Sequence, residues 1–436
     1  MKVARLLATL LRTDSPSLLI VGRTGATALA FVTAPIIARS IGPVGRGETA
    51  AAIATFSILP ILLAFGVPLE VRRLAAIGKG KAALRTARTL CVSVLPISAA
   101  VAWLAHSTIF ASFEADTRIV ATIGLALAPL AMSWMCDLGV LIGVGRLRGV
   151  MTMQLLQPGV YLISILVFLA FGAVTTSTVL IANVLGTLSS CFLGMSLTRT
   201  GLRGERHPMR GMLGASARFA GSSIAESASN RLDQVIALPL MGAFQAGIYS
   251  AAVTVASVPF ALGQALGASY FPLVARSEGE DRQHLREQAI RVSTAISLMC
   301  VPFMVPAIWI GIPILFGSEF NAAVPVAWAS FGGTAVMIVA YVCSMALAAE
   351  GRGNRMTIAQ TGSLIVGVIL LFLLAPTHGA LGAAIASASS YLILLALLVG
   401  GMRVRLRESI LRRNDFPMAF SRIFRSSKRP PSNEES

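Results

Sequence analysis

The stretch ESASNRLDQVIALPLMGAFQAGIYSAAVTVASVP, from Glu226 to Pro259, decides the fold class of this chain. It predicts an apolar helix, a turn bounded by glycines and a second apolar helix. The first helix carries Glu226, Asn230, Arg231 and Asp233. At about 100° per residue, Glu226, Asn230 and Asp233 lie on one face of it. Arg231 points well away from Asp233. Polar residues within a membrane span usually face a protein interior or a water-filled cavity, so these are candidate functional residues.

The same turn occurs earlier in the chain. With a shift of 200 residues, GPVGRGETAAAI at Gly42–Ile53 matches GAFQAGIYSAAV at Gly242–Val253. A weaker echo, shifted by about 206, relates GVGRLRG at Gly143–Gly149 to AEGRGNR at Ala349–Arg355. Two halves of similar layout are typical of secondary transporters, which bind substrate between the halves. The alternative is a chance match in a chain rich in alanine and glycine.

The composition predicts an all-α polytopic membrane protein. Hydrophobic residues make up 55% of the chain and charged residues 13%, against roughly 25% charged residues in soluble proteins. A span needs about 20 apolar residues, and the sequence has room for about twelve. The predicted spans are 17–38, 48–69, 89–111, 119–142, 151–171, 177–198, 212–241, 247–272, 289–316, 323–349, 357–376 and 381–402.

The basic residues predict how these spans are oriented. If the amino terminus is cytoplasmic, 30 of the 36 Lys and Arg residues fall on the cytoplasmic side, as the positive-inside rule requires, and both termini are cytoplasmic. The net charge of +17 then reflects topology and contact with anionic membrane lipids, and nucleic acid is not expected as a partner. The predicted divisions are a six-helix half over 1–200, a cytoplasmic linker over 201–211, a second six-helix half over 212–402, and a basic, partly disordered tail over 403–436.

Several charges fall within or beside the predicted spans. Arg23, Arg218 and Arg231 are the intramembrane cations, and Asp137 is an acid two turns from the end of its span. Arg23 either extends to the lipid headgroups or faces a cavity and binds an anion. Asp137 must be protonated, hydrated or paired. The connector Val71–Arg88 is predicted to be a basic cytoplasmic segment. It is either a solvated helix or a surface helix whose Leu74, Ile77 and Leu84 lie on the membrane face, where it could bind anionic lipid or substrate phosphates.

No motif for catalysis or for a cofactor was found. The chain has no nucleophile and base at motif spacing, no cluster of metal ligands and no phosphate-binding loop, so we expect neither an enzyme nor a metal or cofactor site. The five cysteines all fall within predicted spans without a CxxC pair, which predicts packing residues rather than disulfides. The cysteines are Cys91, Cys136, Cys191, Cys300 and Cys343. The amino terminus predicts a retained amphipathic helix and not a signal peptide.

Four stretches at corresponding span boundaries carry a family resemblance: IIARSIGPVGRGE at Ile36–Glu48, NRLDQVIALPLMGAFQAGIYSAA at Asn230–Ala252, LFGSEFNAA at Leu315–Ala323 and AAEGRGN at Ala348–Asn354. With them the chain resembles the multidrug/oligosaccharidyl-lipid/polysaccharide (MOP) exporter superfamily, and within it the bacterial polysaccharide biosynthesis membrane proteins, the O-antigen-type flippases. The resemblance covers nearly the whole chain and implies two six-helix repeat halves around a central cavity in the cell membrane.

This resemblance implies a transporter that flips a polyprenyl-pyrophosphate-linked oligosaccharide across the cytoplasmic membrane. Arg23, Arg218 and Arg231 would bind the substrate, and Asp137, Glu226 and Asp233 would bind or release a coupling ion. Glycosyltransferases and a polysaccharide polymerase are the implied protein partners. The alternatives are a multidrug or cation antiporter of the same superfamily, a lipid II flippase, and a membrane scaffold for glycosyltransferases that transports nothing. The twelve predicted spans, fewer than the fourteen common in lipid II flippases, disfavour the lipid II alternative.

Overall fold

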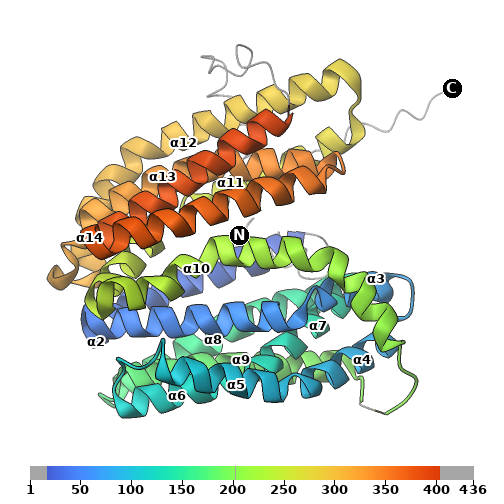
Figure 1. The fold of residues 1–436 in the computed structure, drawn as a ribbon, viewed down its shortest axis with the longest axis horizontal. Coiled ribbons are helices and arrows are strands. Elements are labelled where there is room, and N and C mark those ends of the chain that lie inside the picture. Colours follow the sequence, from blue (N-terminus) through green and yellow to red (C-terminus); the bar gives the residue numbers. More distant parts are fainter. Residues whose placement is uncertain (1–16, 202, 403–436) are drawn as a thin grey trace, which may run out of the picture. The chain divides into compact units, whose positions relative to one another are not determined.

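The computed structural model describes residues 17–201 and 203–402, apart from the side chains of Ser17 and Ile20 and of residues 218, 219, 222, 223, 225, 226, 229 and 230. Over this part of the chain it contains thirteen α-helices, one 3-10 helix and no strand (Figure 1). The predicted tail over 403–436 lies outside the described residues. The helices are α2 (Ser17–Ala64), α3 (Val67–Ala76), α4 (Gly80–Ser93), α5 (Leu95–Ser107), α6 (Ala115–Ala126), α7 (Ala128–Gly143), α8 (Leu147–Ala170), α9 (Thr176–Thr198), α10 (Met209–Ala256), α11 (Phe260–Arg276), α12 (Gly279–Phe316), η1 (Ser318–Phe320), α13 (Ala323–Ala349) and α14 (Gly353–Met402).

The helices have the length and surface of membrane spans. Seven are long and apolar enough to cross a bilayer, or nine if the bent pairs α4 with α5 and α6 with α7 each count as one span. Large apolar side chains also lie on the outside of the bundle, among them Trp103, Phe171 and Phe192, which are 74%, 82% and 74% exposed. Such a surface would be costly in water and is favourable in lipid, where helices satisfy their own backbone groups. The protein is therefore an all-helical multi-pass membrane protein.

Three of the long helices are broken at a single glycine. The breaks are Gly42 in α2, Gly242 in α10 and Gly379 in α14, all with φ between 57° and 77°. This left-handed region suits glycine because a side chain would be strained there. Each break falls between two predicted spans, so α2, α10 and α14 each contain a boundary that the sequence analysis placed in a connecting turn.

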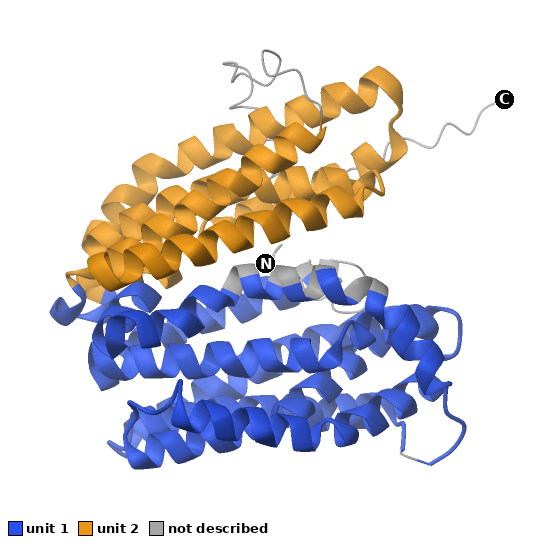
Figure 2. Cartoon of the chain, in the orientation of Figure 1, with its two compact units in different colours: residues 1–251, 315–320 blue, residues 252–314, 321–436 orange. Residues whose placement is uncertain are grey.

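The helices pack into two compact units, coloured separately in Figure 2. The first comprises Met1–Ala251 with Leu315–Phe320. Within it α2 packs against α8 and α9, and α7 packs against α3, α4 and α9. Small residues permit the close approach of α3 and α7: a Cβ at Gly139 would lie 2.6 Å from the Pro68 carbonyl oxygen, and one at Gly143 would lie 2.5 Å from that of Arg72. Backbone contact at glycine is a common basis of helix packing in membranes.

The second unit comprises Ala252–Ile314 with Asn321–Ser436. In it α13 packs against α11 and α14, again through glycines, since a Cβ at Gly333 would lie 3.0 Å from the Cα of Ala388. The two units divide after Ala251, within α10, whereas the predicted repeat halves divide at 201–211. A packing boundary and a repeat boundary are different properties, so the division into halves stays a prediction.

The connector Val71–Arg88 differs from its prediction. It forms part of α3 and α4, and Leu74 and Leu84 are buried against α7 rather than turned to the membrane, while Ile77 is 58% exposed. The connector also contributes buried polar groups. These are Thr86 and Arg88. Glu70, directly before the connector, is also buried and accepts two hydrogen bonds from Arg73. Basic residues are so frequent in this connector that the apolar positions that pack into the core are difficult to recognise from the sequence.

Candidate functional site

The first repeat match coincides with matching backbone geometry. Gly42 has φ 67° and ψ −177°, and Gly242 has φ 77° and ψ 166°. Five residues beyond each break the two helices touch: a Cβ on Gly47 would lie 2.0 Å from the Ala243 carbonyl oxygen, and one on Gly247 would lie 1.8 Å from the Pro43 carbonyl oxygen. These contacts are reciprocal under the shift of 200 residues. They define a local two-fold crossing of α2 and α10, called the glycine crossing below.

The end of α12 and the short helix η1 meet α2 beside this crossing. The Arg39 Nε donates a hydrogen bond of 3.0 Å to the carbonyl oxygen of Leu315, and a Cβ on Gly42 would lie 3.4 Å from a carboxylate oxygen of Glu319. Leu315 lies at the end of α12 and Glu319 in η1. Three of the four stretches that carry the family resemblance therefore converge in the first unit.

Asp137 is paired, and its partner was missed in the sequence. The carboxylate is fully buried on α7 and accepts hydrogen bonds from Arg88 Nη2 on α4 at 2.9 Å and from Thr198 Oγ1 at the end of α9 at 3.0 Å. Arg88 also donates to the Thr198 hydroxyl at 3.1 Å. One carboxylate oxygen, Oδ2, is buried without a partner among the described residues. The ion pair joins three helices and neutralises the acid.

The signal for Arg88 was present in the sequence. Asp137 needs a compensating charge within the membrane, and Arg88 stands one residue before a predicted span. It was assigned to the basic connector with its neighbours because the arginines of a connector cannot be told apart by sequence alone.

Asp233 is held by a tyrosine from beyond the break in its own helix. The Tyr249 hydroxyl donates a hydrogen bond of 2.5 Å to Asp233 Oδ2, and the backbone N–H of Gln234 donates one of 2.8 Å to Oδ1. Tyr249 is 1% exposed. The bond joins the two limbs of α10 across Gly242. The positions equivalent to Asp233 and Tyr249 in the first repeat are Thr33 and Thr49, which are buried and bond to carbonyls of their own helix.

The predicted cations fall into two groups. Arg23 on α2 and Arg231 on α10 are exposed, and neither forms a hydrogen bond or ion pair through its side chain with a described residue. The side chains of Arg218 and Glu226 lie outside the described part of the structure. Among the described side chains, no hydrogen bond or ion pair joins any two of Arg23, Arg231, Asp137 and Asp233. Arg231 and Asp233 interact electrostatically. Asp137 and Asp233 nevertheless have hydrogen-bond partners of their own, and the described residues of the predicted site do not form one cluster.

The second repeat match also recurs in the backbone. Gly145 has φ 75° and Gly351 has φ 73°. The hydrogen bonds that follow correspond under the shift of 206 residues. They run from Gly145 N to Ile142 O at 3.2 Å and from Arg146 N to Leu141 O at 2.9 Å, and from Gly351 N to Ala348 O at 3.0 Å and from Arg352 N to Leu347 O at 3.0 Å.

In the turn of the second unit, at Gly351, the positive charge of the arginines is neutralised by the carboxylate of Glu350. The Glu350 side chain is only 1% exposed, and it is paired with Arg286 from α12 and with Arg352 at 3.3 Å. Arg286 also donates to the Met402 carbonyl oxygen, and Arg355 donates to that of Gly401. Arginine side chains therefore satisfy the carbonyls at the end of α14, a favourable position for positive charge.

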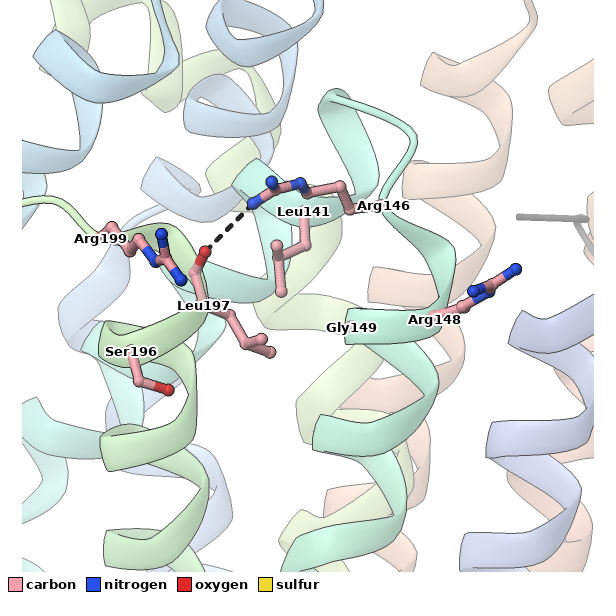
Figure 3. A pocket seen from close by; sticks show the side chains of 7 residues that line it. All are labelled: Leu141, Arg146, Arg148, Gly149, Ser196, Leu197 and Arg199. Atoms are coloured by element: carbon pink, nitrogen blue, oxygen red, sulfur yellow. Dashed lines mark hydrogen bonds between the residues drawn. The ribbon is translucent and has the colours of Figure 1, made fainter. Parts of the chain in front are cut away.

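The turn in the first unit borders a basic pocket of about 340 Å³. Its lining residues are Leu141, Arg146, Arg148, Gly149, Ser196, Leu197 and Arg199 (Figure 3). Arg146 Nη1 donates a hydrogen bond of 3.2 Å to the Leu197 carbonyl oxygen, and the Arg199 side chain lies on the other side of that carbonyl, while Arg148 points away. The sequence analysis did not single out this pocket.

The chain is similar to known proteins in both sequence and fold. The family model described as "Polysaccharide biosynthesis protein" matches residues 36–325, about two thirds of the chain. No curated protein matches. Among solved structures, the lipid II flippase MurJ in an inward closed conformation aligns with a TM-score of 0.73 at 13% identity, covering 92% of this chain and 91% of that chain.

Two other solved transporters have the same fold. An inward-facing multidrug resistance MATE family transporter of the MOP superfamily aligns with a TM-score of 0.68 at 16% identity, covering 88% of this chain and 94% of the other. A MOP superfamily transporter from Pyrococcus furiosus aligns with a TM-score of 0.56 at 16% identity, covering 90% and 94%. At such identities the likeness shows the fold. Together with the family match over residues 36–325, it shows that the chain belongs to the polysaccharide biosynthesis protein family and has the fold of the MOP superfamily.

Proposed function

We propose that this protein moves a polyprenyl-pyrophosphate-linked oligosaccharide from the cytoplasmic to the outer leaflet of the cell membrane, for the synthesis of a cell-surface polysaccharide. Family membership and the MOP fold support this function. The observation that carries it is that Arg23 and Arg231 are exposed residues on candidate membrane spans, and neither forms an ion pair with a described acid. A cation held in this way suits an anionic substrate, and a guanidinium fits phosphate oxygens in a bidentate manner.

The acids support an anionic substrate over a lipophilic cation. A cation antiporter would use free carboxylates, yet Arg88 neutralises Asp137 and Tyr249 and Gln234 hold both oxygens of Asp233. We propose that these two residues, with Glu226, respond to a coupling ion instead. At Asp137 the unpartnered Oδ2 is the atom that would take up a proton. Arg218 joins Arg23 and Arg231 in the proposed substrate site on the sequence alone.

The chain is proposed to cross the membrane twelve times. The helices α2 and α14 and the pair α10 with α11 would each supply two crossings, separated at or near the broken glycines. The bent pairs and the unbroken helices would supply the others. Both termini would then be cytoplasmic, as the distribution of basic residues predicts.

The substrate role is tested at Arg231. Cells that lack the chromosomal copy of this gene are complemented with wild type, Arg231→Ala or Arg231→Lys, and surface glycan and membrane protein level are both measured. We expect Arg231→Ala to abolish export at normal protein level, and Arg231→Lys to restore it in part because lysine supplies the charge without the fork of donors. Arg203→Ala, which removes a charge from the exposed loop before α10, is the matched control and should export normally.

Two results would contradict this role. Normal export by Arg231→Ala at normal protein level would leave the arginine without a function in transport. A fall in protein abundance, rescued by a second mutation of an acid on another helix, would identify a structural ion pair instead.

A further inference from the structure

We propose that the basic pocket between the end of α7, the start of α8 and the end of α9 binds the phosphate group of an anionic phospholipid through Arg146 and Arg199. The two guanidinium groups come from different loops and lie on either side of the Leu197 carbonyl (Figure 3). The hydrogen bond to Leu197 uses one donor of Arg146, and a guanidinium has several more, all suited to phosphate oxygens.

The repeated turn provides an internal comparison. In the second unit Arg352 is paired with Glu350 at 3.3 Å. The residue equivalent to Glu350 in the first unit is Val144, an exposed apolar side chain. The two turns have the same backbone conformation, but only the second contains a carboxylate. The first turn therefore has the equivalent arginine, Arg146, without the equivalent carboxylate. An anion from outside the chain would neutralise its charge.

The backbone at Arg199 gives a second, independent observation. Arg199 follows α9 with φ 46°, and it is one of only two described residues other than glycine with positive φ. Glycine is preferred after the end of a helix because a side chain in this region is strained. At the comparable turns after α7 and α13 the chain uses Gly145 and Gly351. The arginine is therefore kept at a backbone cost, which indicates a role for its side chain.

The depth of the pocket favours a lipid over a free anion. The candidate spans Leu147–Ala170 and Thr176–Thr198 begin and end at the pocket, which places it at the level of the headgroups. Leu141 and Leu197 form its apolar wall, suited to the glycerol and the first carbons of an acyl chain. Basic side chains at this level attract anionic lipids. The inference does not depend on glycan transport.

The test is a lipid titration of the purified full-length protein in a neutral detergent, followed by its melting temperature. The ligands are phosphatidylglycerol, phosphatidylcholine and inorganic phosphate. We expect phosphatidylglycerol to raise the melting temperature of wild type and phosphatidylcholine to have little effect. The variant Arg146→Gln/Arg199→Gln should bind phosphatidylglycerol roughly tenfold more weakly or worse. Arg203→Gln/Arg210→Gln, which removes two exposed charges outside the pocket, should respond as wild type does.

A second variant keeps the test decisive if the double variant does not fold. Arg199→Gly removes the guanidinium and relieves the positive φ, so it should fold at least as well as wild type and still lose part of the response to phosphatidylglycerol. An equal shift with inorganic phosphate would assign the pocket to free phosphate and overturn the lipid. An unchanged phosphatidylglycerol response in both pocket variants would overturn the site.

Discussion

We predict that one methyl group at the glycine crossing changes the balance between a state in which α2 and α10 touch there and a state in which they have separated. A Cβ on Gly47 or Gly247 would lie 2.0 or 1.8 Å from a carbonyl oxygen of the opposite helix. Ordinary contacts between carbon and a carbonyl oxygen are no shorter than about 3.3 Å. In Gly47→Ala or Gly247→Ala the two backbones must therefore separate by about 1 Å or more.

The expected size of the effect follows from the cost of overpacking, which is about 1–3 kcal/mol. If transport requires the crossing to open on the outer side, this cost falls on the closed state alone, and it shifts the two populations by about 5- to 150-fold. Ala251, one turn beyond Gly247 and fully buried, reports the change after replacement by cysteine. Labelling of Ala251→Cys by an impermeant maleimide should be slow in the wild-type background and much faster with Gly47→Ala.

The controls are provided by the same chain. Four native cysteines are buried and Cys300 is half-buried, so Cys300→Ser removes the background. Gly159→Ala on α8 adds a methyl group that meets no atom within 4 Å and should leave labelling unchanged. Equal labelling of Ala251→Cys with and without Gly47→Ala, at equal protein level, would refute the reasoning.

Three further predictions concern the buried partners and the topology. Arg88→Met or Asp137→Asn leaves one member of a buried pair, so either should lower stability by about 3–5 kcal/mol, whereas Arg88→Met/Asp137→Leu should recover most of the melting temperature; no recovery would mean that the pair is not the cause. Tyr249→Phe removes a hydrogen bond to a carboxylate and should lower stability by about 1.5–3 kcal/mol; an unchanged melting temperature would mean that this bond does not stabilise the fold. Reporter fusions after Met212 and after Ser436 should both be cytoplasmic; an outer signal at either position would contradict the two-half arrangement.

The fold class could be predicted because its signals are strong and local. Long apolar segments and glycine-bounded turns indicate membrane helices, and the match of Gly42 with Gly242 located two of the three broken helices. The breaks were predicted as connecting turns between separate spans. A single glycine with positive φ redirects the chain between two helices, and a sequence does not distinguish this from a short loop.

The candidate site was harder to predict because partners are a property of packing. Asp137 was identified from its cost in the membrane, but its partner Arg88 lies 49 residues away. Tyr249 was matched to Thr49 as a repeat position, yet its bond to Asp233 depends on how α10 folds back at Gly242. For Leu74 and Leu84 a solvated face or a membrane face was expected, whereas both pack into the core, because apolar side chains on a basic helix suit a membrane and a protein core equally.

The reciprocal contacts at the glycine crossing also bear on how the two repeats can diverge. In an assembly of two identical copies, any substitution at such a contact would be introduced twice, on both sides of the axis at once. A single chain that contains both copies can change one side alone. Thr49 and Tyr249, two residues beyond Gly47 and Gly247, differ in this way, and only the tyrosine reaches an acid. Gly47 and Gly247 do not have this freedom, because each one lies against the backbone of the other copy.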